Sequence, residues 1–184
     1  FPWIAKGIVA LVNRRRVYKG YNKPKKFDRN LVVIGAGAGG LVTSYIAAAV
    51  KAKVTLVEAG EMGGDCLNYG CVPSKAIIKT AKVANQMRHA DNYGLEPVSP
   101  AISFKKVMAR VHEIIAAIAP NDSVERYTSL GVDVVKGYAK IIDPWTVEIK
   151  KNDGGTQTLT TKTIVVATGA APFVPDLPGI EQSG

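Results

Sequence analysis

The sequence predicts an α/β domain with a parallel sheet, flanking helices and a small three-stranded antiparallel insertion. Two observations carry this prediction. A β-branched run at Leu31–Ile34 leads into a glycine-rich turn and a helical segment at Leu41–Val50, and a second strand follows at Lys53–Val57. Short strand-like runs then occupy residues 132–160, before a buried-type strand returns at Thr163–Ala167.

The composition is that of one globular domain, but its charge is unevenly distributed. The 184 residues are 47% hydrophobic and carry a formal net charge of +9. Residues 1–30 hold nine Lys and Arg against Asp28 alone, a net of +8, so the remaining 154 residues sum to +1. Because no recognition fold accompanies this basic arm, we predict no nucleic-acid binding.

Residues 1–30 form a basic leader with two open interpretations. The apolar stretch up to Val12 is interrupted by Lys6, is too short to span a hydrocarbon core of about 30 Å by itself, and lacks signal-peptide features. Residues 14–16 are three arginines, a pattern typical of the cytoplasmic side of a membrane, where basic residues attract anionic lipid. The leader is either a solvated linker or a membrane-proximal segment. Because residue 1 is not Met, we expect a piece of a longer chain.

The turn after the first strand has the G-x-G-x-x-G pattern of a dinucleotide site. Gly35 permits the tight turn, Gly37 lets backbone N–H groups meet a pyrophosphate, and Gly40 allows close packing of helix on strand. The second strand ends at Glu58, eighteen positions after Gly40, where an acidic side chain accepts hydrogen bonds from ribose hydroxyls. These features together predict a bound dinucleotide without a 2′-phosphate at this site.

The only two cysteines, Cys66 and Cys71, are separated by four residues. Two cysteines are too few for a secreted disulfide scaffold or a zinc site, so we predict no metal site and a reducing, cytoplasmic compartment. A close pair in that compartment indicates a reversible, catalytic dithiol. With a helix expected to start at Pro73-Ser74 and Lys75 nearby, the pKa of Cys71 is expected below the free value of about 8.5.

The rest of the chain gives a coarse order of elements. A helix is predicted at Ala76–Asp91, and a second from a Ser103 cap to about Leu130 with a kink at Pro120. The expected strands of the β-rich part are Val132–Val135, Gly137–Ile142, Thr146–Lys150 and Thr156–Thr160, with a hairpin turn at residues 152–155. Pro172, Pro175 and Pro178 indicate a linker.

Three motifs in this order closely resemble the class I pyridine nucleotide-disulfide oxidoreductases. They are Val33-Ile-Gly-Ala-Gly-Ala-Gly-Gly40, Gly63-Gly-x-Cys-x-x-x-x-Cys-Val-Pro-Ser-Lys75 and Ala167-Thr-Gly169, and the second is highly specific. The family includes dihydrolipoamide dehydrogenase, glutathione reductase and mercuric reductase. The resemblance implies a Rossmann-like FAD-binding domain with a redox disulfide at residues 31–172, and a linker at residues 173–184 toward an NAD(P)H domain that this chain does not contain.

The resemblance also implies roles for individual residues. Cys66 would be the interchange thiol, and Cys71 the charge-transfer thiol against the isoalloxazine. Lys75 would lie near flavin N5, and Ala139 would meet the adenine through its backbone. The implied FAD contacts are Gly35, Gly37, Ala38, Gly40, Glu58, Gly64, Lys75, Ala139, Thr168 and Gly169. Asp65 and Tyr69 depart from the usual family pattern on the substrate side of the disulfide.

The implied activity passes electrons from NAD(P)H through FAD to the Cys66–Cys71 disulfide, and then to a small-molecule disulfide, dithiol or metal-ion substrate. The parent protein would be a homodimer, because the family's acid-base His-Glu pair acts across a dimer. That pair is not assignable here, so we expect the 184-residue chain alone to be inactive. The alternative is a membrane-tethered, flavin-binding redox sensor without turnover, located at the cytoplasmic face.

Overall fold

The structure, a computed structural model, describes residues 2–171 and 173–180, without the side chains of residues 14 and 15. Phe1, Pro172 and residues 181–184 lie outside the described residues, and so do the expectations that involve them. The helices are α1 (Pro2–Val17), α2 (Ala38–Ala49), α3 (Gly64–Asn68), α4 (Cys71–Arg88), α5 (Phe104–Ile118) and α6 (Val124–Ser129), with 3₁₀ helices η1 (Ala90–Tyr93) and η2 (Ala119–Asp122). The strands are β1 (Arg29–Ile34), β2 (Val54–Glu58), β3 (Val132–Asp143), β4 (Thr146–Lys151) and β5 (Thr156–Val166).

The sheet is mixed, and its strands form a closed ring. Four strands run parallel in the order β5-β1-β2-β3, with Val33 opposite both Leu56 and Val165. Beyond this region β3 and β5 each pair antiparallel with β4, which closes the ring β1-β2-β3-β4-β5. The predicted α/β class, with a parallel sheet, flanking helices and a three-stranded antiparallel part, is confirmed.

The strands on both sides of the ring are longer than predicted. The runs at 132–135 and 137–142 are one strand, β3, and the runs at 156–160 and 163–167 are one strand, β5, which ends at Val166. At Gly137 the strand changes partner from β2 to β4. A Cβ at this position would lie 2.5 Å from the Lys150 carbonyl oxygen, so the glycine lets β4 approach closely instead of ending the strand.

Alternate residues of the parallel strands face two different layers. Val33 and Leu56 pack with Leu41 of α2 and Tyr127 of α6 on one face. The residues between them, Val32 and Val57 among others, pack on Val147 and Ile149 of β4 on the other face. Each buried aliphatic side chain of this kind contributes roughly 1.5–3 kcal/mol to folding. The parallel sheet is therefore held between a helical layer and the antiparallel strands.

The helix predicted from Ser103 to about Leu130 is three elements. Ser103 caps α5 as expected, with its Oγ 3.5 Å from the Lys106 N–H nitrogen. The chain then leaves the α-helical pattern through η2, which contains Pro120, a residue without an N–H to continue the helix. Ser123 caps a new helix, α6, and accepts a hydrogen bond from the Arg126 amide at 3.1 Å. The prediction of a single kinked helix was therefore wrong.

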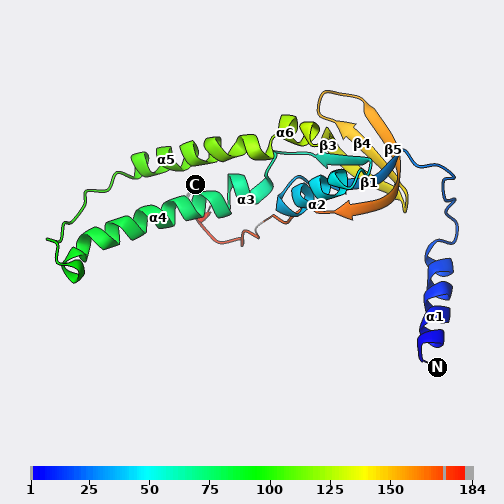
Figure 1. Cartoon of the computed structure of the whole chain (residues 1–184), viewed down its shortest axis with the longest axis horizontal. Coiled ribbons are helices and arrows are strands. Elements are labelled where there is room, and N and C mark those ends of the chain that lie inside the picture. The colour runs from blue at the N-terminus through cyan, green and yellow to red at the C-terminus, as the bar shows by residue number, and fades with distance from the viewer. Residues whose placement is uncertain (1, 172, 181–184) are drawn as a thin grey trace.

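The long helices lie at one end of the molecule and α1 lies at the other. α4 and α5 pack side by side and extend away from the sheet, whereas α1 stands apart at the opposite end (Figure 1). The contact of the leader with the domain includes a stacked ring pair, Tyr18 and Trp145, whose centroids are 5.2 Å apart. Among the described residues, none of the helices combines the length and apolar character needed to cross a bilayer.

Candidate functional site

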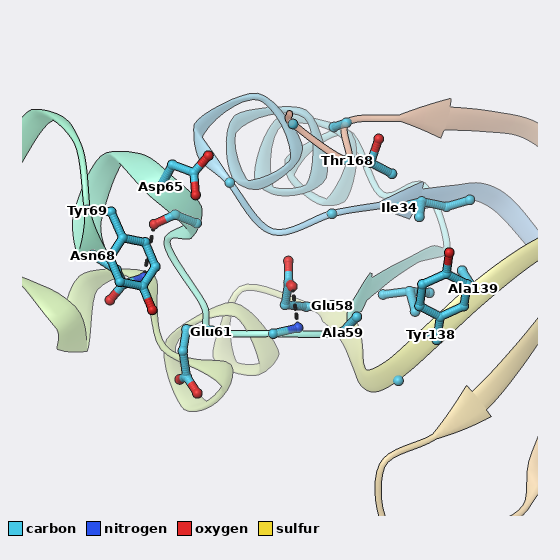
Figure 2. Close-up of a pocket in the computed structure, with 18 residues that line it drawn as sticks. Ile34, Glu58, Ala59, Glu61, Asp65, Asn68, Tyr69, Tyr138, Ala139 and Thr168 are labelled. Carbon is cyan, nitrogen blue, oxygen red and sulfur yellow. Dashed lines mark hydrogen bonds between the residues drawn. The ribbon is translucent and has the colours of Figure 1, made fainter. Parts of the chain in front are cut away.

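A cavity of ≈ 610 Å³ opens at the carboxyl ends of β1, β2 and β5. Figure 2 shows its walls: the turn after β1 and Thr168 on one side, α3 with Asp65 and Tyr69 on another, and Tyr138 with Ala139 of β3 on the third. Ligands of open α/β sheets bind outside the carboxyl ends of the strands. Seven of the ten residues predicted to contact FAD line this cavity: Gly35, Gly37, Glu58, Gly64, Ala139, Thr168 and Gly169.

The glycines of the first turn are required by close backbone contacts. Gly35 has a φ of 104°, and a Cβ there would lie 2.3 Å from the Ala167 carbonyl oxygen. A Cβ on Gly40 would lie only 1.8 Å from the Gly35 carbonyl oxygen. The turn, the end of β5 and the first turn of α2 therefore pack together only because these side chains are absent.

Glu58 holds the backbone on both sides of the cavity floor. Its Oε2 accepts a hydrogen bond from the Ala36 amide at 2.5 Å, and its Oε1 accepts one from the Gly60 amide at 2.6 Å. The carboxylate oxygens have further lone pairs, so each can accept another hydrogen bond from a ligand. Glu58 thus fixes the glycine turn while keeping acceptor capacity toward the cavity.

The segment that carries the cysteines begins in contact with the glycine turn. The Gly63 amide donates to the Ala36 carbonyl oxygen at 3.0 Å. Gly64, with a φ of 56°, lies so close to Gly37 that a Cβ on it would be 2.7 Å from the Gly37 Cα. The Asn68 side-chain amide donates to the Gly64 carbonyl oxygen at 2.9 Å and holds the short helix α3 together.

The two cysteines lie on consecutive helices joined by a tight turn. Cys66 is half-buried within α3, and Cys71 is exposed as the first residue of α4; both are free thiols. The amides of Tyr69 and Gly70 donate to the Asp65 carbonyl oxygen at 2.9 Å and 2.5 Å, which closes the turn. Because helix α4 already begins at Cys71, the expected start at Pro73-Ser74 was too late: Pro73 occupies the third helical position, where no intrahelical N–H is needed.

Most of the chain matches one known protein family. A family model described as pyridine nucleotide-disulphide oxidoreductase matches residues 29–184. The chain belongs to the pyridine nucleotide-disulphide oxidoreductase family. Within this family it has the features of a class I member, as the resemblance in sequence indicated.

Curated relatives of two kinds match this family member. The dihydrolipoyl dehydrogenase of Bacillus subtilis is 33% identical over 166 residues, which cover 85% of the chain and 34% of that protein. The dihydrolipoyl dehydrogenase of Geobacillus stearothermophilus is 37% identical over 157 residues, covering 85% and 32%. The mercuric reductase of Shewanella putrefaciens is 36% identical over 167 residues, covering 88% and 29%. The chain thus spans about one third of the length of these relatives.

The cysteine pair of this oxidoreductase family member is electrostatically unequal. The Cys71 side chain accepts a hydrogen bond from the Cys66 thiol and raises the pKa of Cys66, and burial raises it further. The backbone amide of Cys71 and the positive charge of Lys75 lower this pKa, but they do not outweigh the effect of the Cys71 side chain. The pKa of Cys66 therefore lies above its ordinary value. The lower pKa expected for Cys71 stays a prediction.

Some predicted residues lie outside the cavity wall, and some wall residues were not predicted. Ala38, Gly40, Lys75 and the two cysteines do not line the cavity. Asp65, Asn68 and Tyr69 do line it, and their signal in the sequence was their position between and beside the cysteines. In the part of the chain that the structure describes, no three His, Cys, Asp or Glu side chains gather as a metal site would require.

Proposed function

We propose that residues 31–172 are the FAD-binding, redox-disulfide part of an NAD(P)H-dependent flavoprotein disulfide reductase. One observation carries the proposal: the residues flanking Cys66, namely Asp65 and Asn68, line the same cavity as the glycines of the dinucleotide-type turn. The contact between Gly37 and Gly64 joins the two segments directly. A thiol pair beside a dinucleotide cavity is the arrangement that a flavin-linked disulfide requires.

The residues of the cavity fit a dinucleotide such as FAD. The missing side chains of Gly35, Gly37 and Gly64 leave a cradle of bare backbone, and the first N–H groups of α2, beginning at Ala38, lack intrahelical acceptors. These N–H groups would bind a pyrophosphate, supported by the partial positive charge of the helix end. Glu58 would accept from ribose hydroxyls. FAD, when bound, supplies hydride acceptance from NAD(P)H and electron transfer to a disulfide.

The other residues predicted to contact FAD would lie along different parts of the cofactor. Ala139 would present its backbone to the adenine, and Thr168 with Gly169 would close over the cofactor at the end of β5. Gly40 would act through packing, because it supports the turn without lining the cavity. Lys75 would lie toward the flavin, one turn into α4 from Cys71.

The cysteines would cycle between a dithiol and a disulfide. Oxidation joins the two sulfurs and releases two electrons and two protons; reduction reverses this. As the family resemblance implies, Cys66 would be the thiol that exchanges with substrate after losing its proton, and Cys71 the thiol on the flavin side. We propose a disulfide, dithiol or metal-ion substrate, because the relatives include dihydrolipoyl dehydrogenases and mercuric reductases.

The wider assignments follow the same reasoning. We propose a homodimeric, cytoplasmic parent protein, with residues 173–184 leading toward an NAD(P)H domain. We also propose that the 184-residue chain alone does not turn over, since its relatives are about three times as long. NAD(P)H-dependent disulfide reduction by this chain would contradict that statement.

The central test measures the thiols and the cofactor separately. Mild oxidation of the chain should form one intrachain disulfide, seen by mass spectrometry as the loss of two hydrogens, and this product should be absent in Cys66→Ser and Cys71→Ser. FAD titration, followed by flavin fluorescence, should show weaker binding for Glu58→Ala than for Glu113→Ala, a control on the exposed side of α5. Equal affinity of these two variants, or failure of the native thiols to pair, would refute the proposal.

In the parent protein, anaerobic NAD(P)H should produce a long-wavelength absorption band that is lost in Cys71→Ser. Bound FAD without this band would favour the flavin-binding sensor.

A further inference from the structure

The leader helix α1 exposes an apolar surface that the domain does not cover. Ile4, Ile8 and Leu11 recur at helical spacing on one face and are 42%, 58% and 53% exposed. Trp3 near the start of the helix is 74% exposed. The described side chains of α1 are all exposed, so this apolar area is available to a partner.

The basic residues of the chain are concentrated directly after this apolar surface. Residues 14–26 contain seven Lys and Arg and no acidic residue. The rest of the protein is nearly neutral by comparison, with a net charge of +1 over residues 31–184. Apolar and aromatic side chains beside a polybasic segment match the two layers of an anionic bilayer surface, which presents acyl chains below phosphate groups.

The leader meets the domain at the end opposite the cavity. Tyr18 stacks on Trp145 in the turn between β3 and β4. The Trp145 carbonyl oxygen accepts from the Thr161 amide at 2.8 Å, and Thr161 lies opposite Arg29 at the amino-terminal end of β1. The cavity opens at the other end of β1, beyond Ile34, about 20 Å away for a strand of this length.

We propose that α1 and the basic segment 14–26 bind the surface of an anionic lipid bilayer and hold the domain with its cavity directed away from that surface. Charge complementarity identifies the lipid as anionic, and the exposed apolar side chains favour a membrane over a nucleic acid. Phosphate contacts alone would account for the basic segment but would leave Trp3, Ile8 and Leu11 without a role. This inference is independent of the redox chemistry proposed above.

The test uses the 184-residue chain with vesicles of phosphatidylcholine, with and without phosphatidylglycerol. The chain should cosediment with the anionic vesicles and not with the neutral ones. Each basic residue near an anionic surface contributes about fivefold in affinity, so Lys19→Gln/Lys23→Gln should bind about 30-fold more weakly. The matched control Lys105→Gln/Lys162→Gln removes two exposed charges from the domain and should bind as the native chain does.

Apolar insertion is tested with a single fluorophore. Trp145→Phe keeps an aromatic ring against Tyr18 and leaves Trp3 as the sole tryptophan. Its emission should shift to shorter wavelength on anionic vesicles and be quenched by brominated lipid. Unshifted emission, or equal losses for the leader and control pairs, would overturn the proposal. Salt-sensitive binding to duplex DNA, with vesicle binding unaffected by Trp3→Ala, would replace it with a nucleic-acid arm.

Discussion

An alanine at position 40 tests how closely α2 packs on the turn after β1. Its Cβ would lie 1.8 Å from the Gly35 carbonyl oxygen, whereas a carbon-to-oxygen contact needs about 3.3 Å. The helix or the turn must therefore move by roughly 1.5 Å, and α2 covers Val33 and Leu56 of the core. Overpacking of this kind costs about 1–3 kcal/mol, so Gly40→Ala should lower the free energy of unfolding by that amount.

The neighbouring glycine provides the control. Gly39 lies in the same helical turn, is exposed, and a Cβ there would meet nothing within 4 Å. Gly39→Ala should therefore stabilise the chain by roughly 0.5–1 kcal/mol, because alanine has less backbone freedom to lose in a helix. Urea unfolding followed by circular dichroism measures both variants. Each kcal/mol corresponds to about 2–4 °C in the unfolding temperature of a chain of this size.

The comparison of the two variants separates packing from ligand binding. If Gly40→Ala is as stable as Gly39→Ala, the close contact with Gly35 does not exist and the packing argument fails. If Gly40→Ala loses FAD affinity with unchanged stability, the glycine serves the ligand directly, and its assignment as a packing residue is wrong.

Three further predictions address charge and hydrogen bonding. The pKa of Cys66 is raised chiefly by the Cys71 side chain, so Cys71→Ala should move the alkylation of Cys66 by iodoacetamide to lower pH; an unchanged profile would exclude that coupling. The pKa of Asp28 lies below its ordinary value of 3.8, mainly because the Thr160 amide donates to its carboxylate. A depressed pKa gives stability that is present above the unfolded value and lost as pH falls through the folded one, so Asp28→Asn should unfold with a shallower dependence on pH below about 4; an equally steep loss would refute this. Glu58→Gln should lower the free energy of unfolding by about 1–3 kcal/mol, because its NH₂ group would face one of the two backbone amides that now donate hydrogen bonds to the carboxylate. Urea unfolding at neutral pH tests this, and an unchanged free energy of unfolding would contradict it.

The parallel strands could be predicted because their pattern is local. Val32 and Val33 are β-branched neighbours buried in different layers, so a continuous apolar run was the correct signal for a strand covered on both faces. The continuity of β3 could not be predicted in this way. In the sequence, Gly137 indicates the end of a strand. Only the close approach of the Lys150 backbone in β4 explains why the strand continues through this glycine.

The redox role of the cysteines could be predicted from the sequence, but the local structure that places them could not. The spacing of Cys66 and Cys71 indicated a redox pair, but α3 is five residues long and has no periodicity that a sequence could reveal. Asn68 stabilises it, because its side-chain amide donates to the backbone carbonyl oxygens of residues 62 and 64. The positions of Asp65 and Tyr69 beside the cysteines were visible in the sequence, but that both residues line the cavity follows from this helix.

The contact between Gly37 and Gly64 joins the glycine turn to the segment that carries the cysteines. In the sequence, Gly37 is explained by a ligand whose pyrophosphate approaches the backbone. In the structure, Gly64 packs against the same backbone: its φ is 56°, and a Cβ on it would lie 2.7 Å from the Gly37 Cα, which leaves no room for a larger residue at position 64. The two glycines are 27 positions apart, and the contact requires glycine at position 64, whereas a Cβ on Gly37 would lie 4.0 Å from the Gly64 Cα. The turn that would hold the cofactor and the helix that carries Cys66 are thus fixed to one another by the same small contact, so a shift of one would displace the other.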